Sequence, residues 1–173
     1  MRPAVSDASQ TRIEPARPAD VPLLLELIHE LAVFEKLEHE AQASPEELSR
    51  HLFGPQPRAE AVVAFHAGEP AGFALFFHNF STFLGKPGLY LEDLYVRPAC
   101  RGRGIGEGLL RHLAGLALER GCGRFEWSVL DWNREAIEFY RRLGAVPMDE
   151  WTVHRVSGPA LAALAAGKLP GSR

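Results

Sequence analysis

The sequence predicts a mixed α/β fold that packs in layers around one core. Its 173 residues suffice for one good hydrophobic core and are too few to make two ordinary domains the expectation. Hydrophobic residues make up 46% and charged residues 24% of the chain, which is typical of an ordinary globular protein. The periods of the apolar residues switch repeatedly between those of helix and strand. We expect a flexible tail at 1–10 and a single domain at 11–173.

The first third of the chain predicts a short strand and two helices. An extended segment at 11–16 precedes Asp20, a typical N-cap residue for the helix behind it. The apolar residues of this helix recur at helical spacing: Leu23, Leu24, Leu27, Ile28 and Leu31. Ser44, followed by a proline and two acids, predicts a second helix that reaches about Leu52.

The remaining two thirds predict a β meander and then an alternation of helix and strand. The meander strands are expected at 59–67, 71–80 and 89–96, and the third, LYLEDLYV, is almost wholly apolar. Behind them the pattern predicts a helix at 105–121, a strand at 124–130, a helix at 133–143 and an extended run at 150–156. An Ala/Leu-rich tail ends the chain.

Composition and charge narrow the classes of partner. A formal net charge of -3 gives no overall positive field for nucleic acid or acidic membranes, so we expect neither and favour a cationic partner. The sequence resembles neither a signal peptide nor a membrane span, and Cys100 and Cys122 form no disulfide or zinc pattern, which favours the cytoplasm. The seven histidines lack metal-ligand spacing, so we expect no metal.

The stretch RPACRGRGIG, residues 97–106, joins the apolar strand to the next helix. Backbone NH groups at a helix start have no partner within the helix, and the helix dipole is positive there. Glycines in addition let the backbone approach a phosphate closely. Arginines and glycines alternate in this loop: Arg101, Gly102, Arg103, Gly104 and Gly106. The combination favours an anion site, and a diphosphate is its natural ligand.

Other interpretations of the loop make different demands on the sequence. A Walker A loop needs GxxxxGK followed by Ser or Thr, and the chain has no such string. The dinucleotide signature GxGxxG would need its last glycine at Glu107 or Leu109. Asp131 nevertheless imitates the ribose-binding acid of a Rossmann site, so NAD binding stays open as an alternative. So does a loop whose glycines only form a tight turn.

Three motifs resemble those of the GNAT superfamily of N-acetyltransferases. Arg101-x-x-Gly104-x-Gly106 is similar to its acetyl-CoA pyrophosphate loop, and DWN at 131–133 with AIEFYRRLGA at 136–145 to its second cofactor segment. LYLEDLYV resembles more narrowly the spermidine/spermine and thialysine acetyltransferase branch. The resemblance, which extends roughly from Ile13 to Val156, implies a mostly antiparallel mixed sheet with helices on both faces. It also implies acetyl-CoA as cosubstrate, a small amine as acceptor, and a homodimer with acceptor pockets near the interface.

The resemblance also assigns roles to individual residues. Backbone amides of the loop hold the pyrophosphate: Arg101, Gly102, Arg103, Gly104, Ile105 and Gly106. Further cofactor contacts come from Leu94, Tyr95, Val96, Asn133 and Tyr140, with Asn133 at the pantetheine arm. Tyr140 serves as general acid, and Glu92 and Asp93 serve the acceptor amine.

The chemistry of amine acetylation explains why such groups are needed. An alkylammonium, with a pKa of about 10.4, is protonated at neutral pH and needs a base before it attacks a thioester. Glu92 and Asp93 would point to opposite faces of a regular strand, so they need not share one role, and either acid could instead pair with an arginine. We expect Glu92 to accept the proton, directly or through water, and a backbone amide at 92–96 to stabilise the oxyanion. Tyr140 would protonate the departing sulfur, although its helical spacing also fits a core residue, and neither cysteine acts as nucleophile.

The acceptor is predicted from acids and aromatics at the other side of the site. Glu35, in FEKLEHE, would face a cation, or it belongs to a solvated helix end. The polyamine-acetylating relatives have a tyrosine where this chain has Phe34, and an acid and a tryptophan where it has 81–83, which favours a shorter, lysine-like amine over a polyamine. Trp151 matches an acceptor-side tryptophan of the relatives, or packs in a core or interface. A protein-lysine or N-terminal acetyltransferase and a non-catalytic acetyl-CoA-binding module are the alternatives.

Overall fold

The computed structural model describes residues 10–168, which form two compact units. The first unit ends at Ser128 and the second begins at Val129, and each is described by itself. Apart from Gln10, the tail predicted at 1–10 lies outside the described residues. Within 10–168, no helix has both the length and the apolar character needed to cross a bilayer.

The first unit is built on a five-stranded sheet in the order β1-β2-β3-β4-β5. Its strands are β1 (Thr11–Pro15), β2 (Glu60–His66), β3 (Glu69–Ser81), β4 (Lys86–Val96) and β5 (Phe125–Trp127). All neighbours pair antiparallel except β4 and β5, which run parallel. The mixed, mostly antiparallel sheet is confirmed, and it excludes the Rossmann alternative, which needs a mainly parallel sheet.

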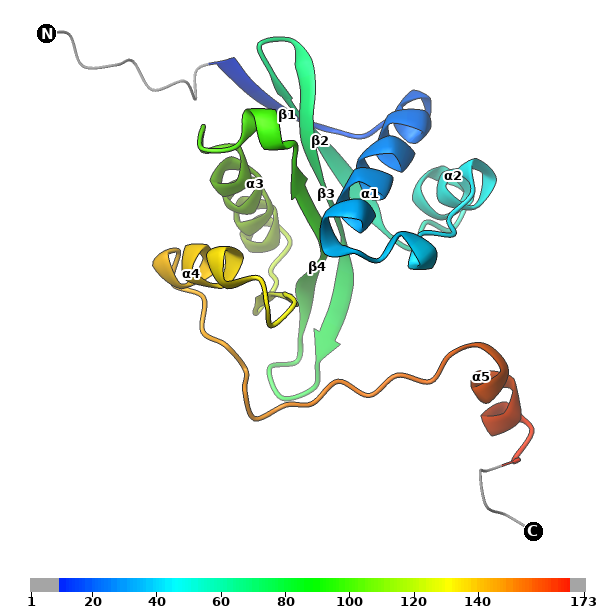
Figure 1. The fold of residues 1–173 in the computed structure, drawn as a ribbon. Coiled ribbons are helices and arrows are strands. Elements are labelled where there is room, and N and C mark those ends of the chain that lie inside the picture. The colour runs from blue at the N-terminus through cyan, green and yellow to red at the C-terminus, as the bar shows by residue number, and fades with distance from the viewer. Residues whose placement is uncertain (1–9, 169–173) are drawn as a thin grey trace, which may run out of the picture. The chain divides into compact units, whose positions relative to one another are not determined.

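Helices cover both faces of this sheet, as predicted (Figure 1). On one face lie α1 (Val21–Glu35) and α2 (Pro45–Phe53), and on the other lies α3 (Ile105–Glu119). The core under α1 joins apolar side chains of helix and sheet: Leu24, Leu27, Leu31, Leu52, Ala61, Val63, Phe73 and Tyr95. Because burying a leucine side chain stabilises a fold by about 1.5–3 kcal/mol, this cluster fixes α1 against β3 and β4.

The two predicted helix caps have different outcomes. The Ser44 hydroxyl accepts a hydrogen bond from the Glu47 amide at 3.2 Å, as expected for the N-cap of α2. Asp20 occupies the N-cap position of α1, but its side chain accepts instead from the Arg17 amide at 2.7 Å. Proline at position 22 explains the difference, because it removes one of the amides that an N-cap side chain would bind.

The second unit contains α4 (Arg134–Arg142) and α5 (Gly158–Ala165). The Asn133 side chain accepts a hydrogen bond from the Ala136 amide at 3.2 Å, so it caps α4 as predicted. The extended run predicted at 150–156 forms no strand in the described part of the chain, where Trp151 is 73% and Val153 81% exposed. A β pattern alone does not make a strand, because strand backbone needs a hydrogen-bonding neighbour.

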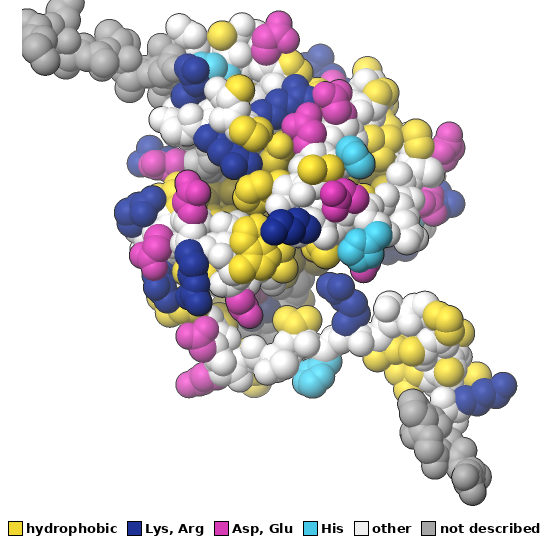
Figure 2. Space-filling model, in the orientation of Figure 1, with side chains coloured by type: hydrophobic (Ala, Val, Ile, Leu, Met, Phe, Trp, Pro, Cys, Tyr) yellow, Lys and Arg dark blue, Asp and Glu magenta, His cyan; other side chains and the backbone are white. Residues whose placement is uncertain are grey.

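Charged side chains of both signs are interspersed over the face shown in Figure 2. Apolar side chains are also exposed in the second unit, with Leu161 and Leu164 of α5 about half exposed.

Candidate active site

The glycine-rich loop connects β4 to α3 through two left-handed residues. After Val96 the chain makes a 3₁₀ turn at Pro98–Cys100, and Gly102 and Gly104 then adopt φ values of 74° and 77°. Side chains with a Cβ disfavour this conformation, so the path of the loop depends on glycine at both positions. The turn delivers the chain directly to the first residue of α3.

The start of α3 is open in the way that an anion site requires. Its N-cap is Gly104, so no side chain caps the first-turn amides. Residues 101–104 are exposed, and a Cβ placed on Gly102 or Gly104 would meet no atom within 4 Å. The positive end of the helix dipole is therefore accessible to a ligand.

A β-bulge interrupts β4 beside this loop. Leu75 of β3 pairs with Asp93 and Phe76 pairs with Leu91, so Glu92 is the extra residue on β4. On the other side of β4, pairing with β5 covers only Leu89 to Leu91. Within the described chain, the edge of β4 at 92–96 thus has no strand neighbour on that side, and edge backbone groups of this kind can bind an extended ligand.

The three residues of β4 that the sequence predicts to contact the cofactor differ in the placement of their side chains. Tyr95 is buried against α1, whereas Leu94 and Val96 are half-buried. The Val96 carbonyl accepts a hydrogen bond from Arg101 Nε at 2.9 Å. The Arg101 guanidinium lies 4.7 Å from the ring centre of Phe34, so the charge of this loop residue lies against α1.

Among the carboxyl groups at this site, Asp93 has the pKa that departs most from its ordinary value. It shares a face of the sheet with Tyr95, two residues further along β4, and its cross-strand partner Leu75 packs against the core under α1. Burial, and then the negative charges of Glu92 and Glu35, raise the pKa of Asp93 to about 6. Burial also raises the pKa of Glu35, the last residue of α1.

Glu92 is exposed, in contrast to half-buried Asp93. The expectation that the two acids point to opposite faces assumed a regular strand, and the bulge at Glu92 breaks the regular alternation there. The structure therefore brings Glu35, Glu92 and Asp93 into electrostatic contact at one end of α1. Three neighbouring carboxylates favour a cation between them.

The other expected site residues belong to the second unit. The Asn133 side chain uses its oxygen to cap α4. Tyr140 is half-buried on the same helix, with its ring centre 5.4 Å from that of Phe139. Trp151 is largely exposed and follows α4 in a segment without regular structure. No cluster of three or more potential metal ligands occurs within residues 10–168.

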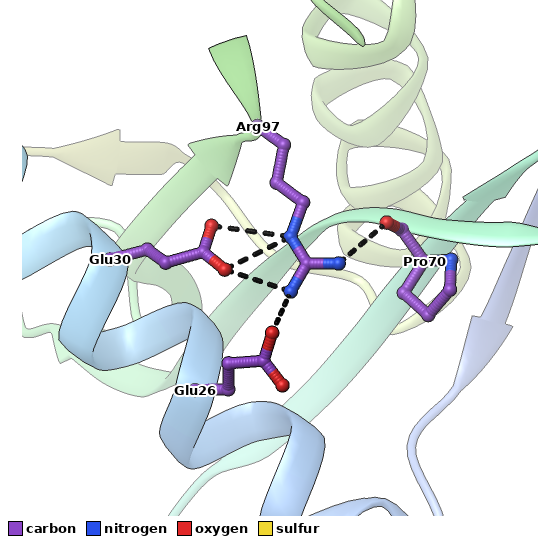
Figure 3. A network of polar contacts seen from close by, with 4 residues as sticks. All are labelled: Glu26, Glu30, Pro70 and Arg97. Atoms are coloured by element: carbon purple, nitrogen blue, oxygen red, sulfur yellow. Dashed lines mark hydrogen bonds and ion pairs between the residues drawn. The ribbon is translucent and has the colours of Figure 1, made fainter. Parts of the chain in front are cut away.

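One polar network next to the site was not predicted. Arg97, the residue after β4, contacts both Glu26 and Glu30 of α1 (Figure 3). The available signal was the pair of acids four residues apart on one face of a predicted helix, because like charges at this spacing repel each other weakly and a cation beside them relieves the repulsion. Sequence alone does not say which of the 19 lysines and arginines supplies it.

Comparison with known proteins identifies the fold and the chemistry. A family model described as the acetyltransferase (GNAT) family matches residues 25–145. Thialysine N-epsilon-acetyltransferase of Mus musculus is 38% identical over 91% of this chain and 98% of its own length. L-ornithine N5-acetyltransferase of Arabidopsis thaliana is 35% identical over 89% of this chain and 87% of its own length.

A solved structure is also similar over most of its length. The V. cholerae integron cassette protein superposes with a TM-score of 0.76 at 28% identity, over 90% of this chain and 98% of that chain. The predicted resemblance to the thialysine acetyltransferases is thus confirmed. The chain belongs to the acetyltransferase (GNAT) family, whose members use acetyl-CoA, and it is an N-acetyltransferase.

Proposed function

We propose that this enzyme transfers the acetyl group of acetyl-CoA directly to the primary amine of a small cationic substrate. The observation that carries the proposal is the uncapped start of α3 beside the unpaired edge of β4. The first feature fits a diphosphate, and the second fits the extended arm that follows it in coenzyme A. The names of two relatives specify Nε of thialysine and N5 of ornithine, which supports a side-chain amine of an amino acid.

The cofactor is held, in this proposal, mostly by backbone. Amides from Arg101 to Gly106 bind the pyrophosphate, and the edge formed by Leu94, Tyr95 and Val96 binds the pantetheine together with Asn133. The exposed loop supports the first assignment, because a Cβ placed on Gly102 or Gly104 would meet no atom within 4 Å and a ligand can therefore approach the backbone there. The open edge at 92–96 supports the second.

The acceptor ammonium group is held by carboxylates at the end of α1. Glu35 and Asp93 bind the cation, and Trp151 contributes an aromatic surface to the acceptor side. Support comes from the raised pKa values of Glu35 and Asp93, since a bound cation relieves the cost of crowding and burying these charges. Phe34 offers no hydroxyl to a second amine, which favours lysine-like side chains over long polyamines.

Proton transfer accompanies attack of the amine on the acetyl carbon. Glu92 accepts the amine proton directly or through water, because it is exposed at the bulge next to the open edge. A backbone amide of 92–96 stabilises the oxyanion, the carbon–sulfur bond breaks, and the Tyr140 hydroxyl protonates the departing sulfur. Asp93, with a pKa of about 6, is the second candidate for the proton, since acids of that pKa act as bases near neutral pH.

The enzyme would act as a homodimer in the cytoplasm. The exposed apolar residues Trp151, Val153 and Val156 and the outer edge of β5 are two surfaces that a second copy of the chain would cover. The free thiols of Cys100 and Cys122 suit a reducing compartment. Sedimentation equilibrium tests the oligomeric state, and a single monomeric species at high protein concentration would contradict the dimer.

Release of free thiol tests the proposed function. The pure protein is incubated with acetyl-CoA and, separately, ornithine, lysine, thialysine, spermidine and a lysine-containing peptide. We expect CoA release with the amino acids. Release with the peptide alone would identify a protein acetyltransferase. Binding of acetyl-CoA without release for any acceptor would identify a non-catalytic binding module.

A further inference from the structure

Arg97 is held from three directions where β4 ends. Its Nε lies 3.1 Å and 3.2 Å from the two carboxylate oxygens of Glu30, and its Nη2 lies 2.8 Å from one of them. The same Nη2 donates to Glu26 at 2.5 Å, and Nη1 donates to the Pro70 carbonyl at 3.1 Å (Figure 3). The side chain is 24% exposed, so water screens these contacts only in part.

The backbone around Arg97 is equally constrained. The Arg97 amide donates to the Ala71 carbonyl of β3 at 2.9 Å. Two residues earlier, burial and then the negative charge of Glu30 raise the pKa of Tyr95, so this ring also lies near the carboxylate that Arg97 binds. One turn of α1 is therefore attached to the end of the sheet through a single planar guanidinium.

Arg97 joins the segment that carries the proposed acceptor site to the segment that carries the proposed cofactor loop. Glu30 lies one turn before Phe34 on α1, and Glu35 ends that helix. Arg97 itself begins the segment that leads to Gly102 and Gly104. The same two segments meet again where Arg101 lies over Phe34, so one helix contacts the loop segment at two points.

We propose that Arg97 is a positioning residue. Through its bonds to Glu26 and Glu30 it fixes the C-terminal end of α1, which carries Glu35, relative to β4. This inference rests on the proposed function, in which Glu35 on α1 and Asp93 on β4 bind one ammonium group. Removing the guanidinium leaves Glu26 and Glu30 as like charges four residues apart, which repel each other on the face that meets the sheet. The end of α1 then shifts away from Asp93, while the backbone of the glycine loop keeps its own geometry.

The test separates acceptor binding from cofactor binding. In Arg97→Gln we expect the KM for the amine to rise about tenfold or more, while the Kd for acetyl-CoA, measured by calorimetry, changes less than about threefold. Arg97→Lys keeps the charge but loses the planar fork, so we expect an intermediate KM. A Kd for acetyl-CoA that weakens in parallel with KM, or a KM unchanged in Arg97→Gln, would overturn the inference.

Arg120 provides a matched control. It makes a forked pair with Glu60, at 2.5 Å and 2.8 Å, that joins the end of α3 to β2, and neither residue belongs to α1 or to the glycine-rich loop. Its side chain is 32% exposed, close to the exposure of Arg97. Arg120→Gln should lower the melting temperature about as much as Arg97→Gln and leave the amine KM unchanged. If both variants changed the amine KM equally, Arg97 would only stabilise the fold, and the inference would be overturned.

A readout without turnover keeps this inference separate from the proposed function. Carbon-13 NMR follows ionisation of the Asp93 carboxyl in the wild type and in Arg97→Gln. Because burial and the charges of Glu92 and Glu35 raise that pKa, we expect it to fall in the variant as α1 moves away. An unchanged titration contradicts the inference, whereas failure of thiol release in the wild type contradicts only the proposed function.

Discussion

Glu35, the last residue of α1, acts on Asp93 of β4 across the interface between helix and sheet. Its negative charge adds to burial and to the charge of Glu92, and together they raise the pKa of Asp93 to about 6. The site therefore carries a carboxyl group that changes its charge within one pH unit of neutrality. A cation placed between these acids is stabilised by all three.

Asp93→Asn should change the pH dependence of stability. Asp93 binds its proton more tightly in the folded chain than in the unfolded chain, where its pKa is the ordinary 3.8. Its stabilising contribution is complete below 3.8 and is lost as the pH rises through about 6. We expect the Asn variant to gain, relative to wild type, on the order of 1–3 kcal/mol between acidic and neutral pH. Urea unfolding at several pH values measures this, and a difference that does not vary with pH would contradict it.

Glu92→Gln should slow the chemical step and move the acid limb of the pH profile. Loss of the proton acceptor lowers kcat by about a hundredfold or more. Loss of the neighbouring charge also lowers the pKa of Asp93, so the rise of kcat/KM with pH should begin at lower pH than in wild type. Steady-state kinetics across pH measure both effects. Glu46→Gln, at an exposed acid of α2, is the control. If Glu92→Gln kept a kcat as high as that of this control, a group other than Glu92 would accept the amine proton.

Tyr140→Phe removes a single hydroxyl from α4. We expect kcat to fall about a hundredfold with little change in the Kd for acetyl-CoA, because the hydroxyl acts when the thiolate leaves. Tyr90→Phe is the matched control, since the Tyr90 hydroxyl contacts Ser128 at 2.8 Å and has no assigned role. Stopped-flow detection of thiol release measures the rate. Full turnover in Tyr140→Phe would remove the general-acid assignment.

The regular parts of the fold follow from local sequence. Apolar spacing located α1 and α3, and Ser44 and Asn133 cap the predicted helices, because these signals act within a few residues. The bulge at Glu92 was not predictable, since it depends on the register between β3 and β4. The prediction of a strand at 150–156 was wrong for a related reason: a strand depends on a hydrogen-bonding neighbour, and a local pattern does not encode one that is distant in sequence.

The candidate site also has a part that local sequence predicts and a part that depends on contacts between residues distant in sequence. The glycine loop was predictable because backbone conformation and helix start are encoded in adjacent residues. The grouping of Glu35 with Asp93, and of Arg97 with Glu30, joins residues far apart in sequence and depends on how α1 lies on the sheet. A single sequence carries no direct signal for such pairs.

The most direct test of the cofactor site is calorimetry of acetyl-CoA with wild type, Gly104→Val and Gly121→Val. Gly104 and Gly121 lie at opposite ends of α3, have φ values of 77° and 67°, and have open space around an added Cβ. Both variants should therefore lose similar stability, about 1–2 kcal/mol. We predict one-to-one binding by wild type and Gly121→Val and at least tenfold weaker binding by Gly104→Val. No binding by wild type, or equal affinity in all three, would contradict a diphosphate site at the start of α3.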